Sequence, residues 1–117
     1  MTKLSEHFSV HEFSCNHCNK LPPGMPYQEL LDFLEELRAH FDAPVTVTSG
    51  YRCPDHNKAV GGATHSQHLL GTAADIKVSG VGPSTVYAWA DENNPTGGVG
   101  KYSSFTHVDT RGSRARW

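Results

Sequence analysis

The chain has 117 residues, which is enough for one domain with a hydrophobic core but too few for a second domain of comparable size. Its 10 Lys and Arg and 12 Asp and Glu residues give a net charge of −2, which excludes binding to nucleic acid or to an anionic membrane by bulk positive charge. Neutral imidazole is a common ligand of transition metals, so the eight His residues favour a metal site. We expect a single domain over residues 1–117 that acts as a monomer.

The N-terminal segment, Met1–Val10, carries Lys3, Glu6 and His7 and lacks the apolar run that a secretory signal needs. No other segment approaches the roughly 18 apolar residues of a membrane span. We therefore expect cytoplasmic synthesis without a signal peptide and no membrane insertion. Action outside the membrane would then require lysis, a dedicated export system or delivery by a phage particle.

The three cysteines allow several interpretations. Cys15-Asn-His-Cys18 has the two-residue spacer of a zinc knuckle, and Cys53-Pro-Asp-His56 could supply two further ligands to a structural zinc site. They could instead be small buried apolar residues, with one optional disulfide among them. His17 is expected to be a solvated surface side chain. A second zinc ion, a disulfide and free thiols all remain open from the sequence.

Two regular elements are predicted in the first half of the chain, after a segment of loop or short turns over Phe8–Lys20. A helix is predicted over Tyr27–Phe41, because leucines recur at steps of three and four residues between charged positions. A strand is predicted over Pro44–Ser49, which is rich in β-branched residues and ends at Gly50.

The second half of the chain predicts three strands and one helix. Ala73–Val78 is a strand candidate, and Pro83–Glu92 is a short helix that begins at its proline. Gly98–Tyr102 and Phe105–Thr110 are predicted to be strands joined by a tight turn. Together the elements predict an α+β domain with a small antiparallel sheet flanked by helices.

The most informative motif is Ser66-Gln-His-Leu-Leu-Gly-Thr-Ala-Ala-Asp75, in which His68 and Asp75 lie seven residues apart across Gly71. The glycine would let the chain turn back so that the imidazole and the carboxylate converge. Zinc accepts both kinds of ligand at about 2.0–2.2 Å. These residues are therefore candidate metal ligands.

The third candidate ligand comes from Phe105-Thr-His-Val-Asp109, where strand alternation sends His107 and Asp109 to the same face. His107 would complete a three-ligand site with a fourth position left for water. An open fourth position distinguishes a catalytic zinc site from a structural one.

On these residues the chain resembles the zinc D-Ala-D-Ala carboxypeptidase family of peptidoglycan peptidases, which is related to the hedgehog signalling domain. The resemblance implies the fold of that family and a Zn²⁺ ion held by His68, Asp75 and His107. It also implies that Arg52 orients the substrate, since a guanidinium can donate two parallel hydrogen bonds to a stem-peptide carboxylate. Besides the two motifs above, the matching segments are His11–Cys15, Ser49–Arg52, Pro54–Asn57, Val60–Gly62 and Thr106–Arg111.

The chain departs from many relatives at the position of the usual general base. They carry Asp or Glu three residues before the last zinc ligand, where this chain has Ser104, and others carry His where this chain has Phe105. Asp109 is then the preferred base, and the rival interpretation is that it orients a neighbouring histidine. Arg52 also has a rival role, in a structural ion pair.

The resemblance predicts a zinc metallopeptidase that cuts peptide bonds in peptidoglycan stem peptides, as carboxypeptidase or endopeptidase. Zinc would activate a water molecule, Asp109 would take its proton, and Arg52 would position the substrate. The expected setting is phage or prophage lysis, with action on the cell wall after release. The alternative is an inactive, zinc-stabilised binding domain or virion component, which Ser104 favours. The sequence does not identify the bond that is cut.

Overall fold

The computed structural model describes residues 3–22, 24–61 and 66–117. Gly62, the last residue of the Val60–Gly62 motif, lies outside the described residues. The elements in chain order are α1 (Val10–Phe13), α2 (Gln28–Phe41), β1 (Val45–Ser49), α3 (Pro54–Ala59), the 3-10 helix η1 (Gln67–Leu70), β2 (Ala73–Val78), α4 (Pro83–Asn93), β3 (Gly98–Lys101), β4 (Thr106–Asp109) and β5 (Ala115–Arg116).

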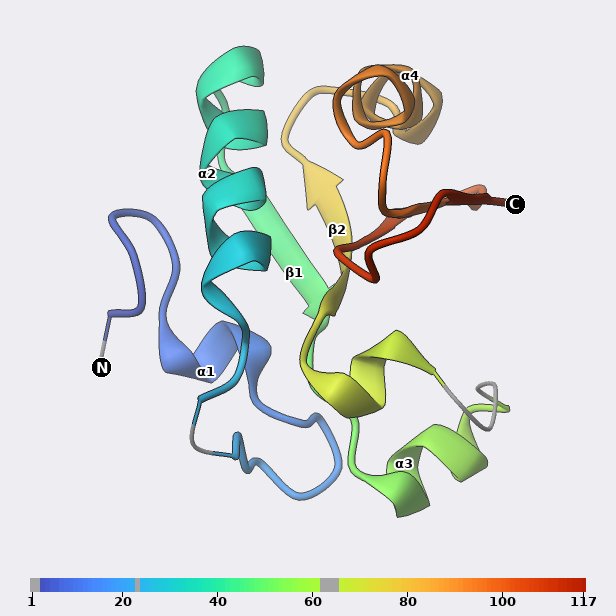
Figure 1. Cartoon of the computed structure of the whole chain (residues 1–117). Coiled ribbons are helices and arrows are strands. Elements are labelled where there is room, and N and C mark those ends of the chain that lie inside the picture. The colour runs from blue at the N-terminus through green and yellow to red at the C-terminus, as the bar shows by residue number, and fades with distance from the viewer. Residues whose placement is uncertain (1–2, 23, 62–65) are drawn as a thin grey trace.

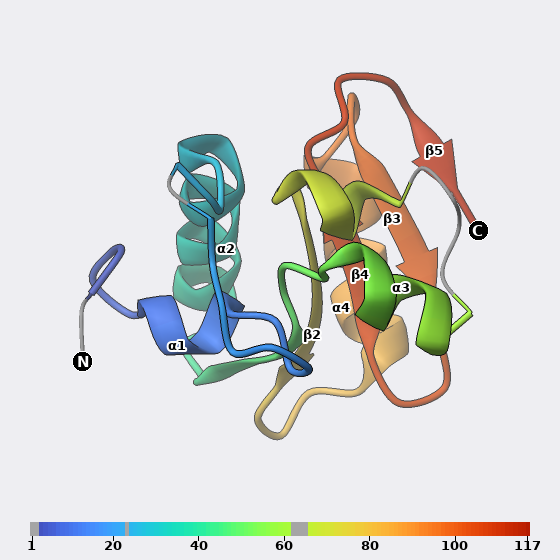
Figure 2. The same ribbon diagram turned by 90° about the horizontal axis from the view of Figure 1, so that it is seen from below.

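The strands form one sheet in the order β1-β2-β4-β3-β5. The pairs β1–β2, β2–β4 and β3–β4 are antiparallel, and the short edge strand β5 runs parallel to β3. Figures 1 and 2 show helices flanking this sheet. The predicted α+β fold with a small, mostly antiparallel sheet is therefore confirmed.

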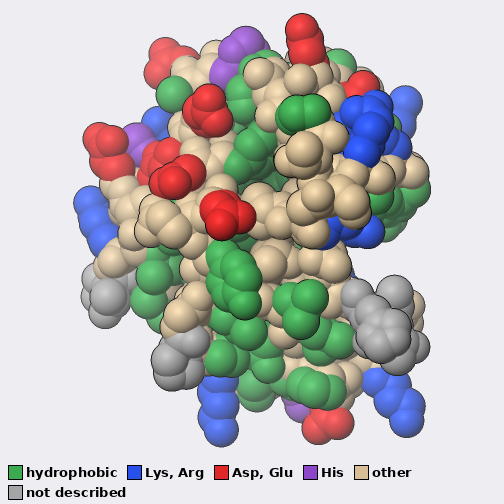
Figure 3. Space-filling view, in the orientation of Figure 1, with side chains coloured by type: hydrophobic (Ala, Val, Ile, Leu, Met, Phe, Trp, Pro, Cys, Tyr) green, Lys and Arg blue, Asp and Glu red, His purple; other side chains and the backbone are tan. Residues whose placement is uncertain are grey.

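The hydrophobic core lies between α2, α4 and one face of the sheet. The apolar side of α2 is buried because its leucines and Phe33 recur on one helical face, and Phe33 contacts Trp89 of α4 with 5.6 Å between ring centroids. Strand alternation brings Ala74, Ile76 and Val78 of β2 into this core. The opposite side of α2 carries acidic side chains, which gather at the upper left of Figure 3.

The other face of the sheet carries Asp75 of β2 and His107 and Asp109 of β4. Asp75 points away from the core because its neighbours, Ala74 and Ile76, point into it. Register then decides which side chains meet there: Asp75 lies opposite His107, and Ala73 lies opposite Asp109. In Figure 1, α3 and the segment that contains η1 lie below this part of the sheet.

Four short elements were not predicted from the sequence: α1, α3, η1 and β5. The longer elements agree with their predictions to within one or two residues at each end. Over the described residues, none of the helices has the length and apolar character needed to cross a membrane.

Candidate metal centre

The three residues predicted to bind a metal come together although they lie on three different elements. His68 belongs to η1, Asp75 to β2 and His107 to β4. Asp75 Oδ1 is 3.3 Å from His68 Nε2 and 3.0 Å from His107 Nδ1. One ligand atom from each residue lies within 4.8 Å of the other two, and all three residues are buried.

Local backbone geometry accounts for the approach of His68. Ser66 Oγ accepts a hydrogen bond from the backbone N–H of His68 at 3.2 Å, which fixes the start of η1. Gly71 then ends η1 in the left-handed conformation, with φ at 72°, and turns the chain into β2. The turn expected at Gly71 is thus found in the structure.

Each histidine has its second ring nitrogen held by a fixed partner. His68 Nδ1 is 2.7 Å from the Gly50 carbonyl, which must accept, so Nδ1 carries the proton and Nε2 is free to bind a metal. His107 Nε2 is 2.7 Å from Asp109 Oδ2, which leaves Nδ1 facing Asp75. Such outer hydrogen bonds fix the tautomers of metal-binding histidines.

These residues fit a zinc ion. Tetrahedral zinc with nitrogen and oxygen ligands at about 2.0–2.1 Å separates its ligand atoms by roughly 3.3 Å. The distances of 3.0 and 3.3 Å from Asp75 Oδ1 to the two imidazoles are close to that separation. Two neutral nitrogens and one carboxylate also form the ligand set of a three-residue zinc site with an open fourth position.

The carboxylate and imidazole groups of the cluster shift each other's pKa values. Burial raises the pKa of Asp75, but its interactions with the imidazoles of His107 and His68 outweigh this effect and hold that pKa well below its usual range. Burial lowers the pKa of His107, but hydrogen bonds to Asp109 and Asp75 raise it overall. The carboxylate of Asp75 is therefore ionised at neutral pH, as a metal ligand must be.

Asp109 lies behind His107, on the far side from Asp75, and its side chain is fully buried. Its Oδ1 accepts hydrogen bonds from the backbone N–H of Gly98 at 2.9 Å and from Nε of Arg111 at 2.9 Å. Its Oδ2 accepts from Arg111 at 2.7 Å and contacts His107 Nε2. Burial raises the pKa of Asp109, but these partners lower it to well below the usual range.

Arg52 lies in the loop after β1 and contacts Asp75 of the same cluster. One terminal nitrogen donates to Asp75 Oδ2 at 3.1 Å, and the other lies 3.4 Å from Asn57 Oδ1. Its Nε donates to Ser49 Oγ at 3.2 Å. Arg52 therefore holds the second oxygen of Asp75 and also faces the cleft above the cluster.

The cluster forms the floor of a cleft of about 510 Å³. Tyr102, Phe105 and Trp117 line it together with Arg111, and the ring of Trp117 is 4.8 Å from that of His107. The sequence alone does not place Trp117 in this cleft, because Trp117 reaches His107 only through the pairing of β5 with β3. A tryptophan directly after a short strand carries no signal of its own.

Ser104, at the position where many relatives carry the acid, is exposed in the turn between β3 and β4 and does not line this cleft. Over the described part of the chain, Asp75 is the only carboxylate in the cleft lining.

Two imidazoles and a carboxylate at the floor of a polar cleft define a candidate metallohydrolase site. The chain belongs to the family described as Peptidase M15, whose sequence profile matches residues 6–109. The chain is also 33% identical over 102 residues to a protein of Haemophilus influenzae named as a probable peptidoglycan L,D-endopeptidase, MepK. That match covers 81% of this chain and 53% of the relative, so the chain spans about half the relative's length.

Proposed function

We propose that this protein is a zinc peptidase that hydrolyses peptide bonds in the stem peptides of bacterial peptidoglycan. The observation that carries the proposal is the His68–Asp75–His107 cluster at the floor of the cleft, in a chain of the Peptidase M15 family. The name of the Haemophilus influenzae relative supports peptidoglycan as the substrate class.

The metal ligands in this proposal are Nε2 of His68, Oδ1 of Asp75 and Nδ1 of His107. Zinc, when bound, would polarise the scissile carbonyl and activate a water molecule as the nucleophile. The protein's own contribution is to keep the two imidazoles in the correct tautomer through the Gly50 carbonyl and Asp109.

Arg52 is assigned two tasks that do not exclude each other. Its hydrogen bond to Asp75 Oδ2 fixes the orientation of that carboxylate. A guanidinium has five N–H groups, and the three contacts to Asp75, Ser49 and Asn57 use three of them. The remaining N–H groups can bind a carboxylate of the stem peptide and so position the substrate.

For Asp109 we favour the second of the two roles considered from the sequence, which is to orient His107. A general base must reach the water whose proton it takes, within hydrogen-bond distance. The carboxylate of Asp109 is fully buried behind His107, and both its oxygens already contact other groups. Asp109 is thus proposed to be a positioning residue.

The central test is zymography on purified peptidoglycan, with and without a chelator. We expect lysis by the wild-type protein, loss of lysis on chelation and recovery on addition of zinc.

The variant His107→Ala should bind zinc at this site weakly and show no hydrolysis above background, because the site loses a ligand. His11→Ala, which changes an exposed histidine on α1, is the matched control and should lyse normally. Mass spectrometry of the products identifies the bond that is cut.

A second candidate function is a zinc-stabilised binding domain without activity. It is favoured by the exposed Ser104 and by a described cleft lining in which Asp75 is the only carboxylate. Zinc bound through His68, Asp75 and His107 without cleavage of any stem peptide would support this alternative and contradict the peptidase.

A further inference from the structure

A second cluster of metal-binding side chains lies outside the cleft. It contains Cys15 and Cys18 from the loop after α1 and Cys53 from the start of α3. Their three sulfur atoms lie within 4.8 Å of one another, and none of the three forms a disulfide. Cys15 is buried, and the other two are half-buried.

The loop that carries Cys15 and Cys18 is a tight, closed turn. The backbone N–H of Cys15 donates to the Lys20 carbonyl at 2.9 Å, and the N–H of Asn19 donates to the Cys15 carbonyl at 2.8 Å. Asn19 has a positive φ of 58°, which lets the chain reverse directly after Cys18. Two cysteines separated by two residues in such a turn form half of a tetrahedral metal site.

Backbone amides point at two of the sulfur atoms. The N–H of Cys53 lies 3.4 Å from Cys15 Sγ, and the N–H of His56 lies 3.4 Å from Cys53 Sγ. Amide donors aimed at sulfur favour the thiolate, which is the form that binds a metal. The first of these contacts also links the two segments that supply the sulfur atoms.

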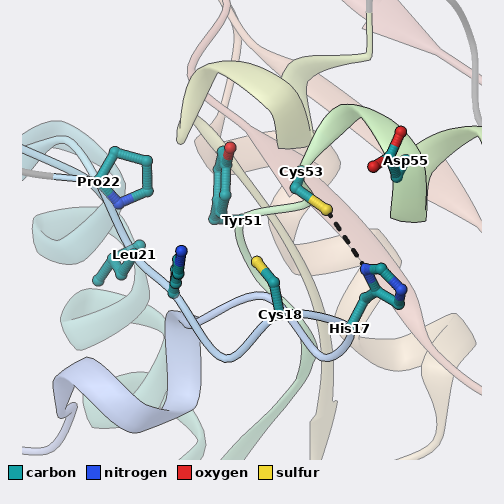
Figure 4. Close-up of a pocket in the computed structure, with 8 residues that line it drawn as sticks. His17, Cys18, Leu21, Pro22, Tyr51, Cys53 and Asp55 are labelled. Atoms are coloured by element: carbon teal, nitrogen blue, oxygen red, sulfur yellow. Dashed lines mark hydrogen bonds between the residues drawn. The ribbon is translucent and has the colours of Figure 1, made fainter.

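An imidazole lies beside the thiols. His17 is exposed, as expected, and its Nδ1 is 3.7 Å from Cys53 Sγ, a contact drawn as a dashed line in Figure 4. Ligand atoms on tetrahedral zinc, with sulfur at about 2.3 Å and nitrogen at about 2.0–2.1 Å, are roughly 3.5–3.8 Å apart. The ring of His17 stacks on that of His56 at 6.0 Å, so a second imidazole is close by.

We propose that Cys15, Cys18 and Cys53 bind a second zinc ion, with His17 as the fourth ligand, in a structural site separate from the cleft. Three thiolates and an imidazole form a ligand set typical of closed, structural zinc sites. Cys18, Cys53 and His17 line a pocket of about 590 Å³, so an ion can reach them from solvent.

Such a site would stabilise a segment of the chain that contacts the proposed peptidase site. The zinc ion would link the loop of residues 15–18 to the segment that begins at Gly50. This segment contacts the cleft twice, because the Gly50 carbonyl accepts from His68 Nδ1 and Arg52 donates to Asp75. The same segment already contacts the N-terminal region through the hydrogen bond from the Tyr51 N–H to the Phe13 carbonyl, at 2.9 Å. A zinc ion would add a strong link across this junction, because metal binding contributes directly to folding stability.

The test is the metal content of the full chain, purified with zinc under reducing conditions and measured by native mass spectrometry. We expect two zinc ions in the wild-type protein, one in His68→Ala and one in Cys53→Ser. His17→Ala should weaken binding at the thiol site by roughly tenfold or more, because the site loses a ligand, whereas His56→Ala is the matched control and should not. A stronger effect of His56→Ala than of His17→Ala would overturn the assignment of the fourth ligand.

Cobalt substitution provides a readout that does not depend on a folded cysteine variant. Cobalt bound by thiolates gives a sulfur-to-metal charge-transfer band in the near ultraviolet, and the cluster of two histidines and an aspartate cannot produce it. We expect this band in the wild-type protein and in His68→Ala. Absence of the band, or a single zinc ion in wild type that is lost in His68→Ala, would refute the thiol site and leave the proposed peptidase site intact.

Discussion

Among single residues, Asp109 is a buried carboxylate that contacts the proposed metal ligand His107 without being a proposed ligand itself. It holds His107 Nε2 at 2.7 Å, and Arg111 and the Gly98 N–H fix it in turn. The orientation of His107 therefore depends on a chain of contacts that ends at the guanidinium of Arg111. Removing the negative charge from Asp109 should therefore lower the zinc affinity of the site, through the altered orientation of His107, more than it lowers kcat at saturating zinc.

Asp109→Asn is predicted to lower the zinc affinity of the cleft site by about 10–100-fold, the usual effect of losing an outer partner of a ligating histidine. An amide can also present its N–H to Nε2, which would favour the wrong tautomer of His107. The measurement is zinc affinity by competition with a chromophoric chelator, together with kcat at saturating zinc.

A general base would give the opposite pattern of results for the same variant. Zinc affinity would be unchanged, and kcat at saturating zinc would fall by about 10²–10⁴-fold. That outcome would refute the positioning role proposed for Asp109 and restore the role preferred from the sequence.

The residues of the candidate site were predictable to different degrees. Spacing and strand alternation indicated that His107 and Asp109 share a face, and they do. The same alternation could not predict which ring nitrogen of His107 faces Asp75, or that Asp109 is fully buried. Both features depend on the position of Asp109, which is set by its contact with Gly98 of β3. The place of Trp117 beside His107 could not be predicted for a similar reason, since it depends on a pairing between distant segments.

Among the strands, β3 has glycines at the two positions that lie opposite Asp109 and His107, which leaves space for these side chains. Gly98 lies opposite Asp109, and Gly100 lies opposite His107, in the β3–β4 pair. A Cβ atom on Gly98 would lie 2.3 Å from Asp109 Oδ2, which is too close for any side chain. The glycine is thus required because the carboxylate fills the space in front of it.

Gly98→Ala is predicted to destabilise the protein by about 1–3 kcal/mol, the usual cost of overpacking a buried site. For a domain of this size that corresponds to a fall in Tm of roughly 4–12 °C. It should also weaken zinc binding in the cleft, since the shift of Asp109 moves His107. Thermal denaturation and a zinc titration test the two effects.

The matched control is Gly82→Ala, because a Cβ atom at Gly82 meets nothing within 4 Å and its φ of −69° suits any residue. Its Tm should change little and its zinc affinity not at all. Equal losses of Tm in the two variants would contradict the steric account of Gly98.

The elements that the sequence predicted show a recognisable residue pattern, which is the apolar repeat of a helix or the residue preference and alternation of a strand. Fourteen residues of α2 repeat the apolar spacing of a helix, and β2 has the boundaries that were predicted for it. By contrast, α3 has six residues and η1 has four, which is too short for periodicity to be visible. Strand β5 has two residues and exists because β3 offers it a partner.

Across the whole chain, the N-terminal segment is attached to the acidic helix α2 by one partly buried carboxylate, that of Glu35. Glu35 Oε2 accepts hydrogen bonds from Ser5 Oγ at 2.6 Å and from the His7 backbone N–H at 2.8 Å. Glu35 Oε1 lies 2.6 Å from His7 Nδ1. These contacts fasten residues 5–7 to α2, and none of the three residues lines the cleft, so the attachment can be tested separately from the proposed metal site.

This attachment predicts how stability depends on pH. Burial raises the pKa of Glu35, but the hydrogen bonds from Ser5 and His7 outweigh it, so its pKa is lowered overall. A lowered pKa in the folded state means that the contribution to stability is complete above the unfolded value of about 4.3. It is then lost as the pH falls through the folded pKa, because protonation removes the acceptor charge.

Glu35→Gln is therefore predicted to lower the free energy of unfolding at pH 7 by about 1 kcal/mol or less, since the side chain is 23% exposed and solvent screens the charge. The difference from wild type should shrink as the pH falls below about 4, where the wild-type carboxylate becomes protonated. Urea denaturation at pH 7 and near pH 3 measures both values. Glu36→Gln, which changes an exposed neighbour on α2, is the matched control and should match wild type at both pH values. A deficit for Glu35→Gln that stays constant down to pH 3 would show that packing, and not the ionised carboxylate, holds the N-terminal segment on α2.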